Sequence, residues 1–238
     1  MNKNPHQIAT EISQDFFYVK KNYVAEKGFT FSYIRYRLLR PLLKFYYKIF
    51  NILHPNRPWT TPASIIILGK LLSKDMVGLE YGSGRSTQFF ARKLKHLTSI
   101  EHHRDWYKKV RKELNTENIK NVDYQFVERN SKHEIFSNPK SWQEKYNINT
   151  SFKLRNEYYD YFQFVNKFET NHFDFILIDG RARVECVLNC IDKLKKNGIL
   201  VLDNSNRDRY FPALKVLNSW RKVTTTNGLF DTTLWFKP

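Results

Sequence analysis

Short apolar segments alternate with helical patterns over the last two thirds of the chain, from about Asp75 onward. Residues 105–114 and 184–194 place their apolar side chains on one helical face. Because strands that alternate with helices form parallel sheets, the pattern predicts a doubly wound α/β domain. Several of the segments are apolar throughout, as expected for strands that are covered on both faces. The five expected strands are residues 76–81, 97–101, 123–128, 173–179 and 198–203.

The C-terminal region adds two more expected strands. Residues 222–238 contain two β-rich segments on either side of Asn227-Gly228, a dipeptide typical of hairpin turns. We therefore predict a mostly parallel, seven-stranded sheet with an antiparallel finish. The connection between the third and fourth expected strands, residues 129–172, is longer than a single crossover helix needs, and we treat it as an insertion. Its second part, residues 156–168, has a helical pattern, and the rest is a candidate substrate lid.

Residues 1–58 differ in character from the α/β domain, which we place at residues 59–238. The chain has no acidic residue between Glu26 and Asp75, and cations alternate with aromatic side chains over residues 29–50. We expect a basic, aromatic, helical N-terminal extension. It could cover the site with its cations reaching water, lie on a membrane surface, or bind RNA. Aromatic residues all round the helix speak against the two-faced pattern that a membrane surface requires.

Composition limits the class of protein. The 238 residues suffice for one α/β domain with an added segment. The formal net charge of +17 favours anionic partners without choosing among nucleic acid, an acidic membrane surface and a charged substrate. Cys186 and Cys190 have no zinc-site spacing, which fits inert thiols in a reducing compartment. No signal peptide and no long apolar stretch is visible, so we expect a cytoplasmic protein, with peripheral contact at the inner membrane surface as an alternative.

A glycine loop, GSG at residues 82–84, follows the first expected strand. Glycine lets a ligand approach the backbone, but the lysine of a phosphate loop is absent and Thr87 replaces the third glycine of a dinucleotide fingerprint. Glu80 would repel a pyrophosphate and suits an ammonium group. Glu101, at the end of the second expected strand, can accept hydrogen bonds from ribose hydroxyls. A ligand with an ammonium group, a ribose and no phosphate is S-adenosylmethionine.

Four segments resemble the class I S-adenosylmethionine-dependent methyltransferases, namely "LEYGSGRST", "TSIEHHRDWY", "FDFILIDGRARVECV" and "KKNGILVLDNSNRDRY". The resemblance covers about residues 59–238 and implies a Rossmann-like methyltransferase fold. It implies that Glu80 and the glycines line the methionine end of the cofactor, that Glu101 binds the ribose, and that Asp179 lies near the sulfonium. The residues that it assigns to the cofactor are Glu80, Gly82, Ser83, Gly84, Ser86, Thr87, Glu101, His102, Asp179, Gly180 and Thr61, with Trp59 and Thr60 beside Thr61.

The segment after the fourth expected strand, DGRAR at residues 179–183, bears on the methyl acceptor. It lacks the Asn/Asp-Pro-Pro-aromatic motif of amino-directed nucleic-acid methyltransferases and the Pro-Cys of cytosine-C5 enzymes, so an oxygen acceptor fits better. Similarity to catechol-type and macrolide-sugar O-methyltransferases implies that Asp179, Asp203 and Asn204 hold Mg²⁺, which would lower the pKa of a substrate hydroxyl. Catechol-type enzymes carry a lysine where this chain has Ala182, so Arg181 or Arg183 would supply the positive charge.

Asp179 is the first candidate for a general base and His102 the second. Four arginines at the same expected edge of the sheet favour an anionic acceptor, such as a phosphorylated or uronic sugar, with a solvated rim as the alternative; they are Arg181, Arg183, Arg207 and Arg209. The sequence therefore predicts a methyltransferase that acts on an oxygen of a small or saccharide-like acceptor. The alternatives are an RNA methyltransferase and a non-catalytic module that keeps the fold and binds a membrane or nucleic acid.

Overall fold

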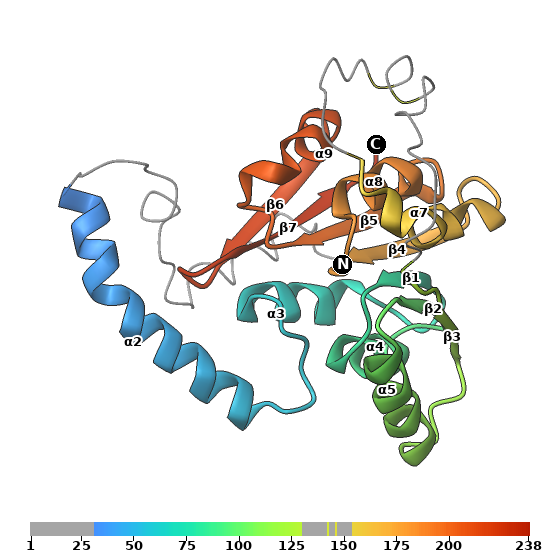
Figure 1. The fold of residues 1–238 in the computed structure, drawn as a ribbon, viewed down its shortest axis with the longest axis horizontal. Helices are drawn as coiled ribbons and strands as arrows, with labels where there is room; N and C mark the ends of the chain where they lie inside the picture. Colours follow the sequence, from blue (N-terminus) through green and yellow to red (C-terminus); the bar gives the residue numbers. More distant parts are fainter. Residues whose placement is uncertain (1–30, 130–141, 143–145, 147–153) are drawn as a thin grey trace.

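A seven-stranded sheet with the strand order β3-β2-β1-β4-β5-β7-β6 forms the centre of the molecule (Figure 1). The computed structural model describes residues 31–129, 142, 146 and 154–238. The first five strands in chain order pair in parallel, and β7 pairs antiparallel with both β5 and β6. The strands are β1 Val77–Tyr81, β2 His96–Glu101, β3 Val122–Phe126, β4 Phe173–Ile178, β5 Leu194–Asp203, β6 Arg221–Thr226 and β7 Asp231–Phe236.

This sheet confirms the predicted doubly wound, mostly parallel architecture. The boundary that differs most is the start of β5, which lies at Leu194 and not at Gly198, and β3 ends at Phe126, two residues before its predicted end. Phe173 pairs with Leu194 while Phe175 pairs with Ile199, so an irregularity in the register takes up the additional residues of β5. The polar residues between Leu194 and Gly198 hide this part of the strand from an analysis of apolar segments.

Helices cover both faces of the sheet (Figure 1). One core layer packs α3 and α4 against Phe175, Leu177 and Val201 of the sheet, and the other packs α7, α8 and α9 against the opposite face. Among the described residues, these helices are α3 Pro62–Leu71, α4 Arg85–Ala91, α5 Arg104–Thr116, α7 Tyr159–Gln163, α8 Arg183–Cys190 and α9 Phe211–Val216, with short 3₁₀ turns at Asn156–Tyr158, Phe164–Lys167 and Asp208–Tyr210.

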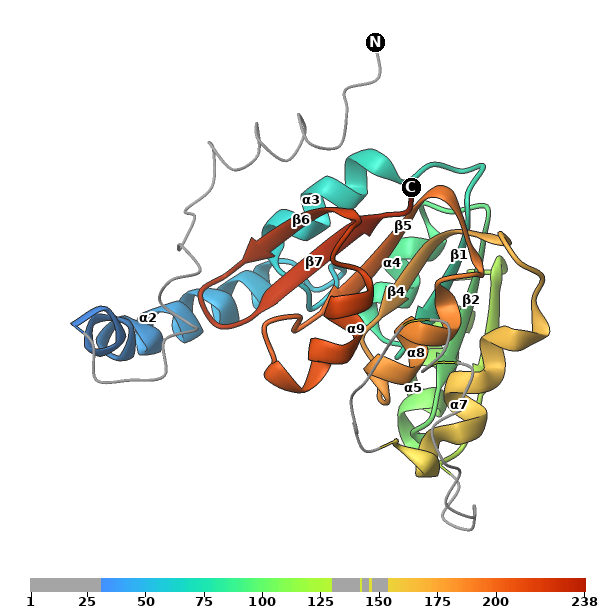
Figure 2. The same cartoon turned by 90° about the horizontal axis from the view of Figure 1, so that it is seen from above.

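The described part of the N-terminal extension is one helix, α2 Phe31–Leu53, which runs through Pro41 and lies beside the body of the domain (Figures 1 and 2). Near its end, the ring of Tyr47 packs edge-on against Phe230, which precedes β7. None of the helices in the described ranges is long and apolar enough to cross a membrane. In the insertion, residues 156–167 form the short helix α7 between two 3₁₀ turns and not one continuous α-helix, whereas most of the candidate lid lies outside the described residues.

Candidate active site

Most of the predicted site residues lie at one edge of the sheet, where its parallel strands end. β1 pairs with β2 on one side and with β4 on the other, so the chain order reverses at β1. A crevice outside the carboxyl ends of the strands at such a point is the usual ligand site of an open α/β sheet. Glu80 is the second-last residue of β1 and Glu101 is the last residue of β2. Asp179 follows β4, and Asp203 ends β5.

The loops after β1 and β4 approach each other closely, and each contributes a glycine. Gly82 has φ +93°, a conformation that side chains rarely adopt. A Cβ atom on Gly82 would lie 2.6 Å from the backbone nitrogen of Gly180, so a larger residue has no room there. The two loops therefore pack backbone against backbone at the point where the strand order reverses.

Glu80 is completely buried and supports the glycine loop through a hydrogen-bonded hydroxyl. Its Oε2 accepts hydrogen bonds from Thr87 Oγ1 at 2.6 Å and Ser99 Oγ at 2.7 Å, and Thr87 Oγ1 in turn accepts from the Gly84 amide at 3.0 Å. The other oxygen, Oε1, has no partner among the described residues. Burial raises the pKa of Glu80 to about 7, against the effect of the hydroxyl donors. The contact with an ammonium group stays a prediction.

Glu101 is almost fully buried and accepts more hydrogen bonds than Glu80. Its Oε1 accepts from the backbone amides of His102 and His103, each at 2.8 Å. Its Oε2 accepts from Ser83, from the amide at 3.1 Å and the hydroxyl at 2.9 Å. Burial acts to raise the pKa of Glu101, but the donors from His102, His103 and Ser83 outweigh it and the pKa is lowered. Glu101 is therefore an anion at neutral pH, and its bond to the Ser83 hydroxyl is one that a ligand hydroxyl can replace.

His102 lies on the β2 side of the site. Its ring packs edge-on against Tyr158 and Tyr161, with centroids 5.3 and 5.6 Å away, and its Nδ1 is 3.0 Å from Glu101 Oε1. β1 lies between β2 and β4, so His102 and Asp179 follow strands that are not neighbours. Of the two candidate bases, Asp179 is the one beside the other acidic residue of the site, Asp203.

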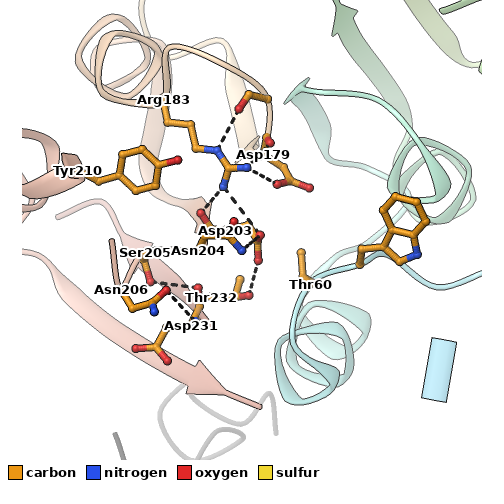
Figure 3. Close-up of polar contacts among 12 residues, drawn as sticks. Thr60, Asp179, Arg183, Asp203, Asn204, Ser205, Asn206, Tyr210, Asp231 and Thr232 are labelled. Atoms are coloured by element: carbon orange, nitrogen blue, oxygen red, sulfur yellow. Dashed lines mark hydrogen bonds and ion pairs between the residues drawn. The ribbon is translucent and has the colours of Figure 1, made fainter. Parts of the chain in front are cut away.

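Arg183 is placed between Asp179 and Asp203 (Figure 3). Its Nη2 lies 2.7 Å from Asp179 Oδ1, its Nη1 lies 3.8 Å from Asp203 Oδ2, and its Nε donates to the Gly180 carbonyl at 3.0 Å. The guanidinium also donates to the backbone carbonyls of Asp179 and Asp203. This placement depends on Ala182, whose left-handed conformation (φ 48°) makes Arg183 the first residue of α8.

The two carboxyl groups share this one cation. Burial and then the charge of Asp179 raise the pKa of Asp203 well above its usual range, with Arg183 acting against them. Burial raises the pKa of Asp179 as well, again against the effect of Arg183. Asp203 is held in place by Thr232 Oγ1 at 2.7 Å and by Asn204 Nδ2 at 2.6 Å. Asp179 is the more accessible acid, with 29% of its side chain exposed against 5% for Asp203.

The structure does not support the expected Mg²⁺ site. Asp179, Asp203 and Asn204 do come together, but the guanidinium of Arg183 lies between the two carboxyl groups and Asn204 donates to Asp203. Within the described ranges, no cluster of three or more His, Cys, Asp or Glu side chains could hold a metal ion. Two arginines were expected to replace the lysine of catechol-type enzymes. Arg183 lies between Asp179 and Asp203, whereas Arg181 is exposed.

Thr61 is fully buried at the start of α3 and supports the site indirectly. Its amide donates to Thr232 Oγ1 at 3.2 Å, and its hydroxyl bonds to that of Thr225. Thr61 thus fixes Thr232, which holds Asp203. Its predicted contact with a cofactor stays a prediction.

Two tryptophans flank the glycine loop. Trp106 Nε1 donates to the Ser83 carbonyl at 2.8 Å, and the Trp106 ring lies 6.2 Å from that of Trp59. The guanidinium of Arg85, at the start of α4, lies 5.4 Å from the Trp59 ring. Trp59 is half exposed and lines two neighbouring clefts.

Helix α2 forms one wall of both clefts. The inner cleft, of about 340 Å³, lies between Asp179, Asp203 and Asn204 on one side and Tyr47, Asn51, Trp59 and Phe230 on the other. The outer cleft, of about 470 Å³, shares Tyr47, Asn51 and Trp59 and is lined by three cations, Lys44, Lys48 and Arg85.

Two hydrogen bonds fix this wall: Tyr47 Oη donates to the Trp59 carbonyl at 2.7 Å, and Arg85 Nη1 donates to the Asn51 carbonyl at 3.1 Å. Tyr47 and Asn51 were not predicted as site residues. The only signal was the alternation of aromatic and basic residues in this helix.

No protein-family model matches the sequence, and no curated protein matches it. Among solved structures, a methyltransferase-like protein from Silicibacter pomeroyi is 26% identical, with a TM-score of 0.52 over 77% of this chain and 90% of that one. A candidate methyltransferase from Streptococcus mutans, in complex with S-adenosylhomocysteine, is 14% identical, with a TM-score of 0.48 over 71% and 93% of the two chains. An rRNA methylase from Streptococcus thermophilus is 10% identical, with a TM-score of 0.48 over 71% and 90%. The first similarity, together with the strand order, shows a Rossmann-like methyltransferase fold.

Proposed function

We propose that the protein transfers a methyl group from S-adenosylmethionine to an oxygen of a small anionic acceptor, such as an acidic or phosphorylated sugar. The observation that carries the proposal is Glu101, a buried carboxylate that stays charged at the end of β2. It accepts a hydrogen bond from the Ser83 hydroxyl, whose place a ligand hydroxyl can take. The fold is methyltransferase-like, and Gly82 and Gly180, at the reversal of strand order, are both partly exposed.

The residues at the reversal of strand order fit this cofactor. The ribose hydroxyls can replace the Ser83 hydroxyl on Glu101, and we assign the methionine portion to the partly exposed glycines, Gly82 and Gly180. When bound, the cofactor supplies an electrophilic methyl group on a sulfonium. Methyl transfer then depends mainly on holding the acceptor oxygen in line with that group.

Asp179 is the residue that we assign as general base. It borders the inner cleft, and its raised pKa makes it a better proton acceptor than an ordinary aspartate. Arg183 keeps its carboxylate oriented through the 2.7 Å contact. His102, on the other side of β1, is assigned to the adenosine side of the site and not to proton transfer.

The anionic acceptor is suggested by the outer cleft. Lys44, Lys48 and Arg85 line it, and none of the described residues in its lining is acidic. Because this cleft shares Trp59 with the inner one, an acceptor held there by its carboxylate or phosphate can extend a hydroxyl towards Asp179. An RNA acceptor is the second candidate, favoured by the net charge of +17, and its binding would weaken steeply with salt.

Calorimetry with S-adenosylhomocysteine and its 2′-deoxyribose analogue tests the cofactor assignment. We expect wild type to bind the analogue about tenfold more weakly, which is one hydrogen bond to a charged acceptor. Glu101→Gln should bind both more weakly and no longer distinguish them. Glu128→Gln, the same change at an exposed position, is the matched control. Absence of binding by wild type would contradict the proposed function. Discrimination retained by Glu101→Gln would contradict the ribose contact.

A further inference from the structure

Helix α2 carries a continuous row of exposed apolar side chains, which we call the apolar stripe. It consists of Phe31, Ile34, Leu38, Leu42, Phe45 and Ile49. Their spacing of three or four residues keeps them on one face of an α-helix. Each is between 38% and 83% exposed. Soluble domains seldom leave so long an apolar row in water, and such rows mark surfaces of interaction.

The stripe points away from the clefts. Tyr47 and Asn51 face the body of the domain, where they bond to Trp59 and Arg85. Residues two apart on a helix lie about 200° around its axis, so Phe45 and Ile49 lie opposite this face. Of the remaining aromatic residues, Tyr36 is buried and Phe50 is half-buried, whereas Tyr46 is 60% exposed. Tyr46 comes four residues after Leu42 and therefore borders the stripe without crossing to the opposite face. The sequence alone did not show this separation of two faces.

The charges of α2 indicate what covers the stripe. The helix has five cations, Arg35, Arg37, Arg40, Lys44 and Lys48, and no acidic residue. Pairing of two α2 helices through the stripe would bring ten positive charges together, which costs free energy. A surface that combines hydrocarbon with negative charge satisfies both properties of the helix. The boundary between headgroups and acyl chains of an anionic bilayer is such a surface.

We propose that α2 docks the protein on anionic phospholipid, with the apolar stripe in the headgroup region and two exposed cations outside the clefts, Arg35 and Arg37, at lipid phosphates. The helix lies on the membrane and does not cross it. In this orientation the face with Tyr47 and Asn51 continues to line the clefts, so docking and the site use opposite faces of one helix. The proposal does not depend on the methyl-transfer reaction.

Co-sedimentation of the full chain with vesicles, without cofactor, tests the docking. We expect binding to phosphatidylcholine vesicles that contain about 30% phosphatidylserine and little binding to phosphatidylcholine alone. Leu38→Glu and Leu42→Glu should each weaken binding about tenfold or more, because a side chain that enters the lipid becomes charged. The matched control is Phe211→Glu, which makes the same change at an exposed apolar residue of α9 and should leave binding unchanged.

Three results would overturn the proposal. Binding that survives both stripe substitutions would mean that charge alone attracts the protein to lipid. A wild-type dimer in sedimentation velocity that Leu42→Glu dissociates, with vesicle binding unchanged, would assign the stripe to a second copy of the chain. A loss of thermal stability in both stripe variants, again with vesicle binding unchanged, would assign it to contacts within the chain.

Discussion

Glu80 and Glu101 are buried carboxyl groups on adjacent strands, and their pKa values shift in opposite directions. Glu101 receives four hydrogen bonds, three of them from backbone amides, and these stabilise the charged form. Glu80 receives two, both from hydroxyls, and one of its oxygens has no partner among the described residues. The fuller burial of Glu80 and its lack of backbone donors together account for the opposite direction of the two pKa shifts. Only Glu101 is fully charged at neutral pH without a ligand.

The raised pKa of Glu80 predicts a pH-dependent cost to stability. An unfolded chain releases this proton near pH 4.5 and the folded chain near pH 7, so the folded state is destabilised as pH rises between these values. We expect the unfolding free energy of wild type to fall by up to about 3 kcal/mol relative to Glu80→Gln over this range. Urea unfolding at a series of pH values measures it. Glu128→Gln should instead run parallel to wild type, and a parallel Glu80→Gln curve would contradict the pKa.

At the scale of elements, contact between backbones limits which residues the loops after β1 and β4 can carry. Gly82 combines a positive φ with a close approach to Gly180. Gly69, within α3, has ordinary helical surroundings, and a Cβ there would meet only the end of Lys93 at 3.8 Å. The same substitution should therefore have opposite effects at the two positions.

We expect Gly82→Ala to lower the unfolding free energy by about 2 kcal/mol or more, because the added methyl meets backbone and the φ is strained. Gly69→Ala should raise it by up to about 1 kcal/mol, the gain of alanine over glycine in a helix. Chemical unfolding of both variants measures the difference. If Gly82→Ala were as stable as wild type, the loops would have room to separate, and their close approach could not define the site.

Elements also show what the sequence could and could not predict. β1 and β4 are continuous apolar segments, and both were predicted to within one residue of their ends. The start of β5 was missed because its first residues are polar and pair through a register irregularity. The wall that α2 forms was not predictable, since Tyr47 meets Phe230 across more than half of the chain. Contacts of that separation leave no local pattern. The position of Arg183 depends likewise on the backbone of Ala182.

At the scale of the whole molecule, one polar network joins the parallel strands β4 and β5 to the antiparallel hairpin of β6 and β7. Arg183 links Asp179 after β4 to Asp203 at the end of β5, and Thr232 of β7 donates to Asp203. Thr61, the residue before α3, then connects Thr232 to β6 through Thr225. The network therefore couples the site to the packing of the antiparallel hairpin. Its only cation among these residues is Arg183.

Removal of that cation should destabilise the entire fold. Arg183→Met leaves two buried carboxyl groups without compensation, and we expect a loss of about 3–5 kcal/mol at neutral pH. The loss should shrink in acid, because both carboxyl groups can then bind protons at less cost. Arg181→Met, at the exposed neighbour, should change stability by less than about 0.5 kcal/mol. Unfolding by urea with and without a chelator measures both effects. Because Arg183 occupies the position expected for Mg²⁺, the chelator should have no effect on wild type. A chelator-sensitive wild type, or a loss in Arg183→Met that is independent of pH, would show that the guanidinium is not the charge that balances Asp179 and Asp203.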